Sequence, residues 1–117
     1  MKKMELQQTV YKEKYVHMRE VFEDYLQATM GAMVSTRYDV QSKYDLCYSK
    51  AVLMVSETSA SVMHKLDNSI KKVRFDVNFN DDDPQPCLVD TNIPTLFDEV
   101  RLSLQKDLAK ACEKLGI

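Results

Sequence analysis

The chain is poor in the residues that interrupt helices. Its 117 residues include two glycines, and its three prolines all follow residue 83. Glycine and proline are the strongest helix breakers, so the first two-thirds of the chain carries few signals that would end a helix. Two glycines also leave little scope for a phosphate-binding loop made of backbone amides. The composition therefore predicts a mainly α protein built from long helices.

Long apolar runs and closely spaced cysteines are missing as well. The longest run without a polar residue is Ala51–Val55, whereas a membrane-spanning helix needs about 20 apolar residues. The N-terminus starts with Met-Lys-Lys but lacks the apolar stretch of a signal peptide. Cys47, Cys87 and Cys112 are odd in number and far apart, unlike the cysteines of secreted scaffolds or zinc sites. We expect a cytoplasmic protein with reduced thiols and no membrane segment.

Residues suited to catalysis, metal binding or nucleic-acid binding are also scarce. The histidines are His17 and His64, and neither has a second metal ligand at helical spacing. No nucleophile elbow or His-Glu-x-x-His pattern occurs, so we expect no enzyme, metal or cofactor, although folding can still bring Cys47 beside either histidine. The net charge is -2, with +3 on residues 1–75 and −5 on residues 76–117. This balance lacks the clustered basic charge of a nucleic-acid-binding domain.

The first part of the chain has the apolar spacing of an amphipathic helix over about residues 3–31. One stripe repeats every seven residues, and a second stripe alternates with it. The two stripes consist of Met4, Tyr11, Met18, Tyr25 and Ala32, and of Tyr15, Phe22 and Thr29. Such a repeat is typical of a coiled coil or helical bundle. Gly31 is the predicted end of this helix.

A second helix is predicted over about residues 36–71. Thr36 and Asp39 resemble a capping box at its start, and its apolar residues follow at steps of three and four from Tyr44 to Val73. One alternative remains open at this point. Without a break near Gly31, the two segments would form a single rod about 105 Å long, which would need a coiled-coil partner.

The last predicted helix covers about residues 95–115. Pro94 suits a first turn, Thr95 and Asp98 suit an N-terminal cap, and Gly116 suits a C-terminal cap. The apolar stripe of this helix is Phe97, Val100, Leu104, Leu108, Ala111 and Leu115. Three apolar helices in a single domain, residues 1–117, predict a three-helix bundle or half of a dimeric bundle.

One short segment follows a different period. Apolar Val73, Phe75, Val77 and Phe79 alternate with polar residues, which predicts a β segment near residues 73–79. A lone strand leaves its backbone unpaired. Three pairing partners for this strand remain as alternatives. They are residues 87–90 of the same chain, the same segment of a second copy, and the sheet edge of another protein. The segment can also cap the end of the bundle in an extended conformation.

An acidic loop is predicted over residues 80–94. The spacing of its acidic and amide side chains resembles a calcium-binding EF-hand loop, but Asp81 stands where that loop needs glycine and Cys87 where it needs glutamate. We therefore expect a solvated loop whose carboxylates are Asp81, Asp82 and Asp83.

The tyrosine-rich stripes favour binding over catalysis, because a tyrosine ring is apolar with a polar tip and suits an interface. Our hypothesis is a non-enzymatic protein–protein interaction module, an adaptor or subunit, that acts through long amphipathic helices as a homodimer. Its two predicted contact faces are Tyr11, Tyr15, Met18, Phe22 and Tyr25, and Val73, Phe75, Val77 and Phe79. Two alternatives remain. One is an inhibitor or immunity-like protein that presents the acidic loop to a basic site, and the other is a secreted helical carrier with one disulfide.

Overall fold

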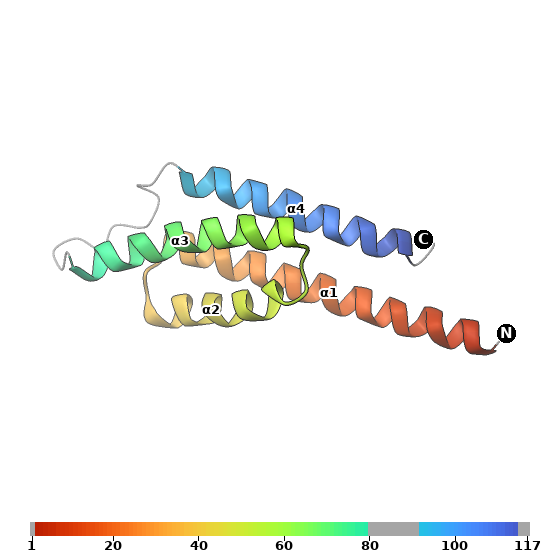
Figure 1. Ribbon diagram of the computed structural model, residues 1–117. Helices are drawn as coiled ribbons and strands as arrows, with labels where there is room; N and C mark the ends of the chain where they lie inside the picture. The colour runs from red at the N-terminus through yellow and green to blue at the C-terminus, as the bar shows by residue number, and fades with distance from the viewer. Residues whose placement is uncertain (1, 80–91, 115–117) are drawn as a thin grey trace.

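The protein is a bundle of antiparallel helices (Figure 1). The computed structural model describes residues 2–79 and 92–114, and it describes side chains in residues 12–72 and 92–114. These residues form four helices, which are α1 (Lys2–Val34), α2 (Tyr38–Val52), α3 (Glu57–Phe79) and α4 (Asn92–Lys114). Successive helices run in opposite directions, as in an up-down-up-down bundle. The mainly α prediction is confirmed, whereas the prediction of three helices is wrong.

The additional helix arises because the predicted helix 36–71 is split at residues 53–56. Ser56 lies just before α3, and its hydroxyl oxygen accepts a hydrogen bond from the Ser59 backbone N–H at 3.2 Å. The Ser56 backbone N–H donates to Oδ2 of Asp107 in α4 at 3.0 Å. A helix start exposes backbone N–H groups that need acceptors. Here the Ser56 hydroxyl and the Asp107 carboxylate are two such acceptors. The chain therefore turns back here, and the single-rod alternative is wrong.

The connection between α1 and α2 is closed by a buried glutamine. The side-chain amide of Gln41 donates hydrogen bonds to the carbonyl oxygens of Ala32 at 3.0 Å and Ser35 at 2.8 Å. These bonds satisfy carbonyl groups that the end of α1 leaves without helical partners. Gly31 does not end the helix. A Cβ atom at this position would lie 3.3 Å from Cγ1 of Val40, so the glycine lets α1 and α2 approach closely.

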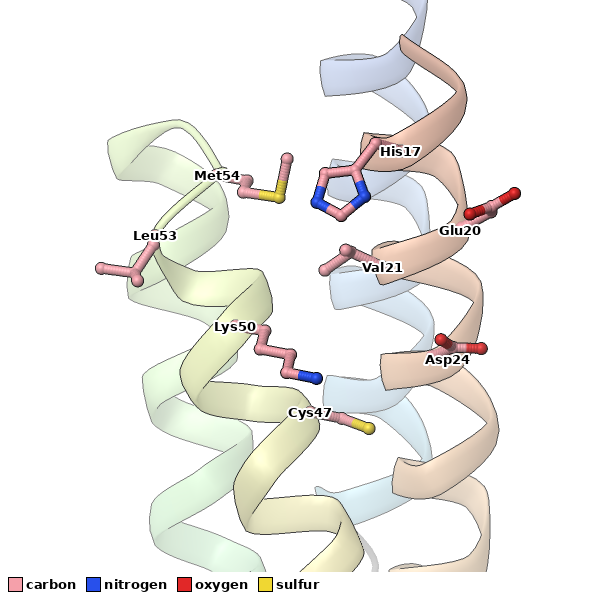
Figure 2. Close-up of a pocket in the computed structure, with 8 residues that line it drawn as sticks. All are labelled: His17, Glu20, Val21, Asp24, Cys47, Lys50, Leu53 and Met54. Carbon is pink, nitrogen blue, oxygen red and sulfur yellow. The ribbon is translucent and has the colours of Figure 1, made fainter. Parts of the chain in front are cut away.

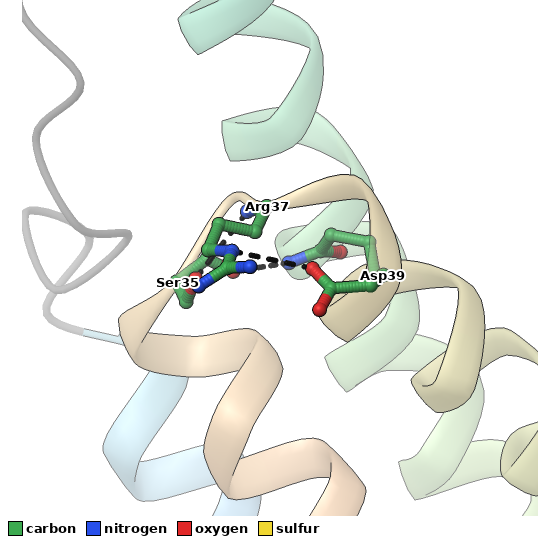
Figure 3. A network of polar contacts seen from close by, with 4 residues as sticks. Ser35, Arg37 and Asp39 are labelled. Atoms are coloured by element: carbon green, nitrogen blue, oxygen red, sulfur yellow. Dashed lines mark hydrogen bonds and ion pairs between the residues drawn. The ribbon is translucent and has the colours of Figure 1, made fainter.

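The start of α2 differs from the predicted capping box of Thr36 and Asp39. Arg37 occupies the N-cap position, and its side chain makes no capping hydrogen bond. Its backbone N–H donates to the Ser35 hydroxyl oxygen at 3.3 Å, and its guanidinium lies 3.3 Å from the Asp39 carboxylate (Figure 3). Both charged side chains of this ion pair are exposed, so the pair contributes little to stability.

The predicted β segment at residues 73–79 is also wrong, because Val73–Phe79 forms the last turns of α3. Each residue that extends a helix gains a backbone hydrogen bond within the same segment, whereas a lone strand gains none. The candidate partner strand, residues 87–90, lies outside the described residues. So do residues 80–91 of the acidic loop, while residues 92–94 belong to α4. The sequence places the last helix at about 95–115, and α4 covers Asn92–Lys114.

The core lies between all four helices. Its buried apolar side chains are Phe22, Tyr25, Ala28, Ala32, Met33, Tyr44, Ala51, Met63, Leu66, Ile70, Ile93, Val100 and Leu104. Along the described side chains of α1, full burial begins at Phe22, and residues 12–21 are exposed or half-buried. None of the described helices combines the length and hydropathy needed to cross a membrane.

Candidate functional site

The helices of the bundle differ in length, and this leaves one end incomplete. Helix α1 has 33 residues, whereas α2 has 15. At the end of the bundle where both chain termini lie, α1 and α4 continue beyond the point where α2 ends and α3 begins (Figure 1). We call residues 12–18 of α1 and 108–114 of α4 the open end. Met54 of the α2–α3 connection lies beside these two segments, and their inward faces have fewer helical neighbours than the rest of α1 and α4.

A pocket of about 620 Å³ marks this incomplete end, and we call it the axial pocket. Its lining comes from α1, α4 and the α2–α3 connection and consists of Lys14, Tyr15, His17, Met18, Met54, Ala111 and Lys114. Tyr15 and Met18 continue the helical stripe that is buried further along at Phe22 and Tyr25. At Tyr15 and Met18 this stripe is half-buried, and an apolar stripe that is partly exposed at one end of a fold is a feature of interaction surfaces.

Tyr15 also joins the two helices of the open end. Its hydroxyl interacts with the thiol of Cys112 in α4, and a hydrogen bond with this thiol is the main cause of a raised pKa of Tyr15. The aromatic ring is half-buried and forms part of the pocket wall. Tyr15 is therefore a half-buried residue of α1 that lies near Cys112 of α4.

A second pocket, of about 590 Å³, lies in the groove between α1 and α2, and we call it the groove pocket (Figure 2). Lys50 and Cys47 extend from α2 toward α1, and the imidazole of His17 lies beside Met54. The carboxylates on the α1 side of the lining point away from α2. The complete lining is His17, Glu20, Val21, Asp24, Cys47, Lys50, Leu53 and Met54.

The groove pocket brings together one Cys-His pair that the sequence leaves open. Cys47 and His17 line the same pocket, but no hydrogen bond between them occurs among the described contacts. His64 is exposed on α3. Cys47 and Cys112 are free thiols, and Cys87 lies outside the described residues. Within residues 2–79 and 92–114, no group of three or more side chains is arranged to hold a metal ion.

A cluster of tyrosines fills the core beside these pockets. The rings of Tyr25, Tyr44 and Tyr48 are tilted against one another, with centroids 6.2 to 6.3 Å apart. The Tyr44 hydroxyl donates to Oδ1 of Asp67 at 2.8 Å, and Nζ of Lys71 lies 3.0 Å from Oδ2 of the same carboxylate. Burial raises the pKa of all three tyrosines above the usual value. The cluster thus links α1, α2 and α3 internally.

The structure divides the first predicted contact face into an inner and an outer part. Phe22 and Tyr25 are 1% and 0% exposed and belong to the core. Tyr15 and Met18 are half-buried at the open end. Tyr11 lies on α1, but its side chain is outside the described set. The outer part is therefore the portion of this face that a partner can reach.

The second predicted face lies on the last turns of α3. Val73, Phe75, Val77 and Phe79 are helical, and their side chains are outside the described set. The predicted acidic contact, Asp81–Asp83, lies outside the described residues altogether.

Sequence reasoning missed Lys50 and Met54 as pocket residues. Both owe their position to the turn at residues 53–56, which places the end of α2 beside α1. The available signal was Ser56 followed by Glu57, because a serine N-cap with an acidic first turn is typical of a helix start.

Comparisons with known proteins add no relative from which a role can be transferred. No family model matches the chain, and no match was found among curated proteins or solved structures. The function must therefore be inferred from the geometry of the pockets and the open end.

Proposed function

We propose that this chain is a non-enzymatic protein–protein interaction module that associates with a second copy of itself through the open end. The observation that carries the proposal is the apolar stripe of α1, which passes from the core at Phe22 to the half-buried positions Met18 and Tyr15 at the axial pocket. Ala111 of α4 faces the same axial pocket. Covering these side chains removes apolar surface from water, which favours association.

A second copy suits this surface because of the number of helices involved. The closed part of the bundle is formed by α1, α2, α3 and α4, whereas at the open end α1 and α4 extend beyond α2 and α3 (Figure 1). A copy related by a twofold axis brings its own α1 and α4, so the paired open ends regain four helices around a shared core. The same patch is used on both chains, as in an isologous dimer.

The charges around the axial pocket are compatible with such pairing. Lys14 and Lys114 line the pocket, and Glu13 and Glu113 are their neighbours in sequence. A twofold arrangement can set the lysines of one copy against the glutamates of the other, as flanking charges do in coiled coils. Rim charges of this kind affect partner choice more than affinity.

Three other hypotheses about function stay predictions. They are a contact through Val73–Phe79, an inhibitor acting through Asp81–Asp83, and a carrier with one disulfide. None of the described contacts favours them over self-association.

The proposal is tested by the solution mass of the intact chain, measured by light scattering across a concentration series. The variant is Tyr15→Glu, and the matched control is Tyr38→Glu, because Tyr38 is 88% exposed at the start of α2, at the other end of the bundle. We expect the parent and the control to dimerise alike and Tyr15→Glu to weaken association at least about tenfold. Ala111→Glu should have the same effect from α4.

Circular dichroism separates this result from unfolding, since all variants should keep the helical signal of the parent. A parent protein that stays monomeric at every concentration would refute the proposal. Equal dimerisation of Tyr15→Glu and Tyr38→Glu would place the interface elsewhere and would refute it as well.

A further inference from the structure

The groove pocket has the features of a small-molecule site, and we propose that it binds an anionic amphiphile, a monocarboxylate with an apolar chain. Its volume of about 590 Å³ falls within the range of about 300–1,000 Å³ that is common for ligand pockets. The apolar side chains that face the groove are Val21 from α1 and Met54 from the α2–α3 connection, whereas the side chain of Leu53 points away from α1 (Figure 2). A hydrocarbon chain laid along Val21 and Met54 would shield these side chains from water.

The polar groups of the pocket select the head group. Lys50 reaches across the groove from α2, and His17 provides a ring N–H from α1 (Figure 2). No ion pair formed between described residues involves Lys50. Lys50 is exposed, and its ammonium group is therefore able to pair with the anionic head of an amphiphile whose chain lies beside Val21 and Met54.

The acidic residues of the lining do not cancel this charge within the groove. The side chains of Glu20 and Asp24 point away from α2 in Figure 2, whereas the Lys50 side chain extends toward α1. The positive group therefore lies on the inner side and the negative groups on the outer side of the lining. This polarity orients a bound carboxylate toward α2.

The same geometry disfavours other ligand classes. Metal binding needs converging ligands, and the described residues contain no such group. A phosphate is usually held by several backbone N–H groups or by an arginine fork, whereas this lining offers the side chains of Lys50, in the last turn of α2, and of His17, within α1. A single negative charge matches these two donors better than a dianion does.

This inference has a readout separate from that of self-association, and the two pockets share part of their lining. His17 and Met54 line both pockets, but Lys50, Cys47 and Val21 belong to the groove pocket and are absent from the axial lining. Loss of dimerisation in Tyr15→Glu would therefore leave ligand binding intact, and the two proposals can fail separately.

Cys47 provides a reporter at the site, because its thiol points into the groove. The intact protein is treated with iodoacetamide with and without decanoate, below the concentration at which decanoate forms micelles. Peptide mass spectrometry then gives the alkylation rate of each cysteine. We expect decanoate to slow alkylation of Cys47 at least about fivefold at saturation while Cys112 reacts at its original rate, and decanol, which lacks the charge, to protect Cys47 much less.

The charge requirement is tested with Lys50→Gln, for which we expect about tenfold weaker protection by decanoate, as for the loss of a charge-assisted hydrogen bond. Lys65→Gln is the control, because Lys65 is exposed on α3 and lies outside this lining. Protection of Cys47 and Cys112 to the same extent would mean non-specific binding. Equal protection by decanol and decanoate, equal affinity of Lys50→Gln and the parent, or no protection at all would each overturn the proposal.

Discussion

Two neighbouring tyrosines in the core should respond in opposite ways to the same substitution. In Tyr44→Phe the lost hydroxyl is the one that donates to Asp67 at 2.8 Å. Asp67 is 3% exposed and keeps its contact with Lys71 at 3.0 Å, but water cannot readily replace the missing donor. A hydrogen bond to a buried charged group contributes about 1.5–3 kcal/mol, so we expect Tyr44→Phe to lower the free energy of unfolding by about this amount.

In Tyr25→Phe the lost hydroxyl has no hydrogen-bond partner among the described residues, and its oxygen is buried. A buried polar group without a partner costs about 1–3 kcal/mol, and the phenyl ring keeps the packing of the aromatic cluster. We therefore expect Tyr25→Phe to leave stability unchanged or to raise it by about 1 kcal/mol. The two rings have centroids 6.3 Å apart, so each variant is a matched control for the other.

Urea denaturation at neutral pH, followed by circular dichroism, measures both effects. The two variants should differ by at least about 1.5 kcal/mol in unfolding free energy, which corresponds to roughly 6 °C in melting temperature for a domain of this size. Equal losses in Tyr25→Phe and Tyr44→Phe would show that packing alone decides stability here. Such a result would refute the assigned hydrogen-bond pattern.

Three further predictions concern stability and use the same denaturation assay. Tyr25 and Tyr44 have a raised pKa in the fold, so above about pH 10 the unfolded chain binds fewer protons than the folded one, and unfolding free energy should fall by up to about 1.4 kcal/mol per pH unit for each. Constant stability between about pH 9 and about pH 11 would contradict this. Gln41→Ala loses the two hydrogen bonds to the carbonyl groups at the end of α1, so it should lower the free energy of unfolding by about 1–3 kcal/mol. An unchanged urea midpoint would contradict this. Asp107→Ala should cost about 1–2 kcal/mol, because Ser56 loses its acceptor at the start of α3, and a loss under about 0.3 kcal/mol would argue against this role.

The helical parts of the fold were predictable because their signals are local. The spacing of Val100 and Leu104 predicts one buried face of the last helix, and both side chains are buried in α4. Phe22 and Tyr25 likewise lie on a stripe that faces the core. Helical periodicity reports which side of a helix is apolar, and this property does not depend on the rest of the chain.

The turn at residues 53–56 was not predictable in the same way. Ala51–Val55 is an apolar run that continues the helical pattern, and the cap signal of Ser56 and Glu57 that follows it is short. The turn is stabilised by Asp107, a residue far along the chain that accepts a hydrogen bond from Ser56. Tertiary contacts of this kind override local preference. The alternation at Val73–Phe79 failed for a related reason, because no strand accompanies it in the described part of the chain and the helix extends through it.

The limits of sequence reasoning at the open end follow from helix length. A single stripe of α1 contributes Phe22 to the core and Tyr15 to the surface, and the sequence pattern is the same at both positions. What distinguishes them is the end of α2 at Val52, which no local signal in α1 records. A charge at Phe22 must therefore destabilise the monomer by several kcal/mol, so a loss of assembly in Phe22→Asp would report unfolding. Tyr15 is half-buried at the axial pocket, so a charge there disturbs the monomer less than a charge at Phe22, and for this reason the outer position tests the interface.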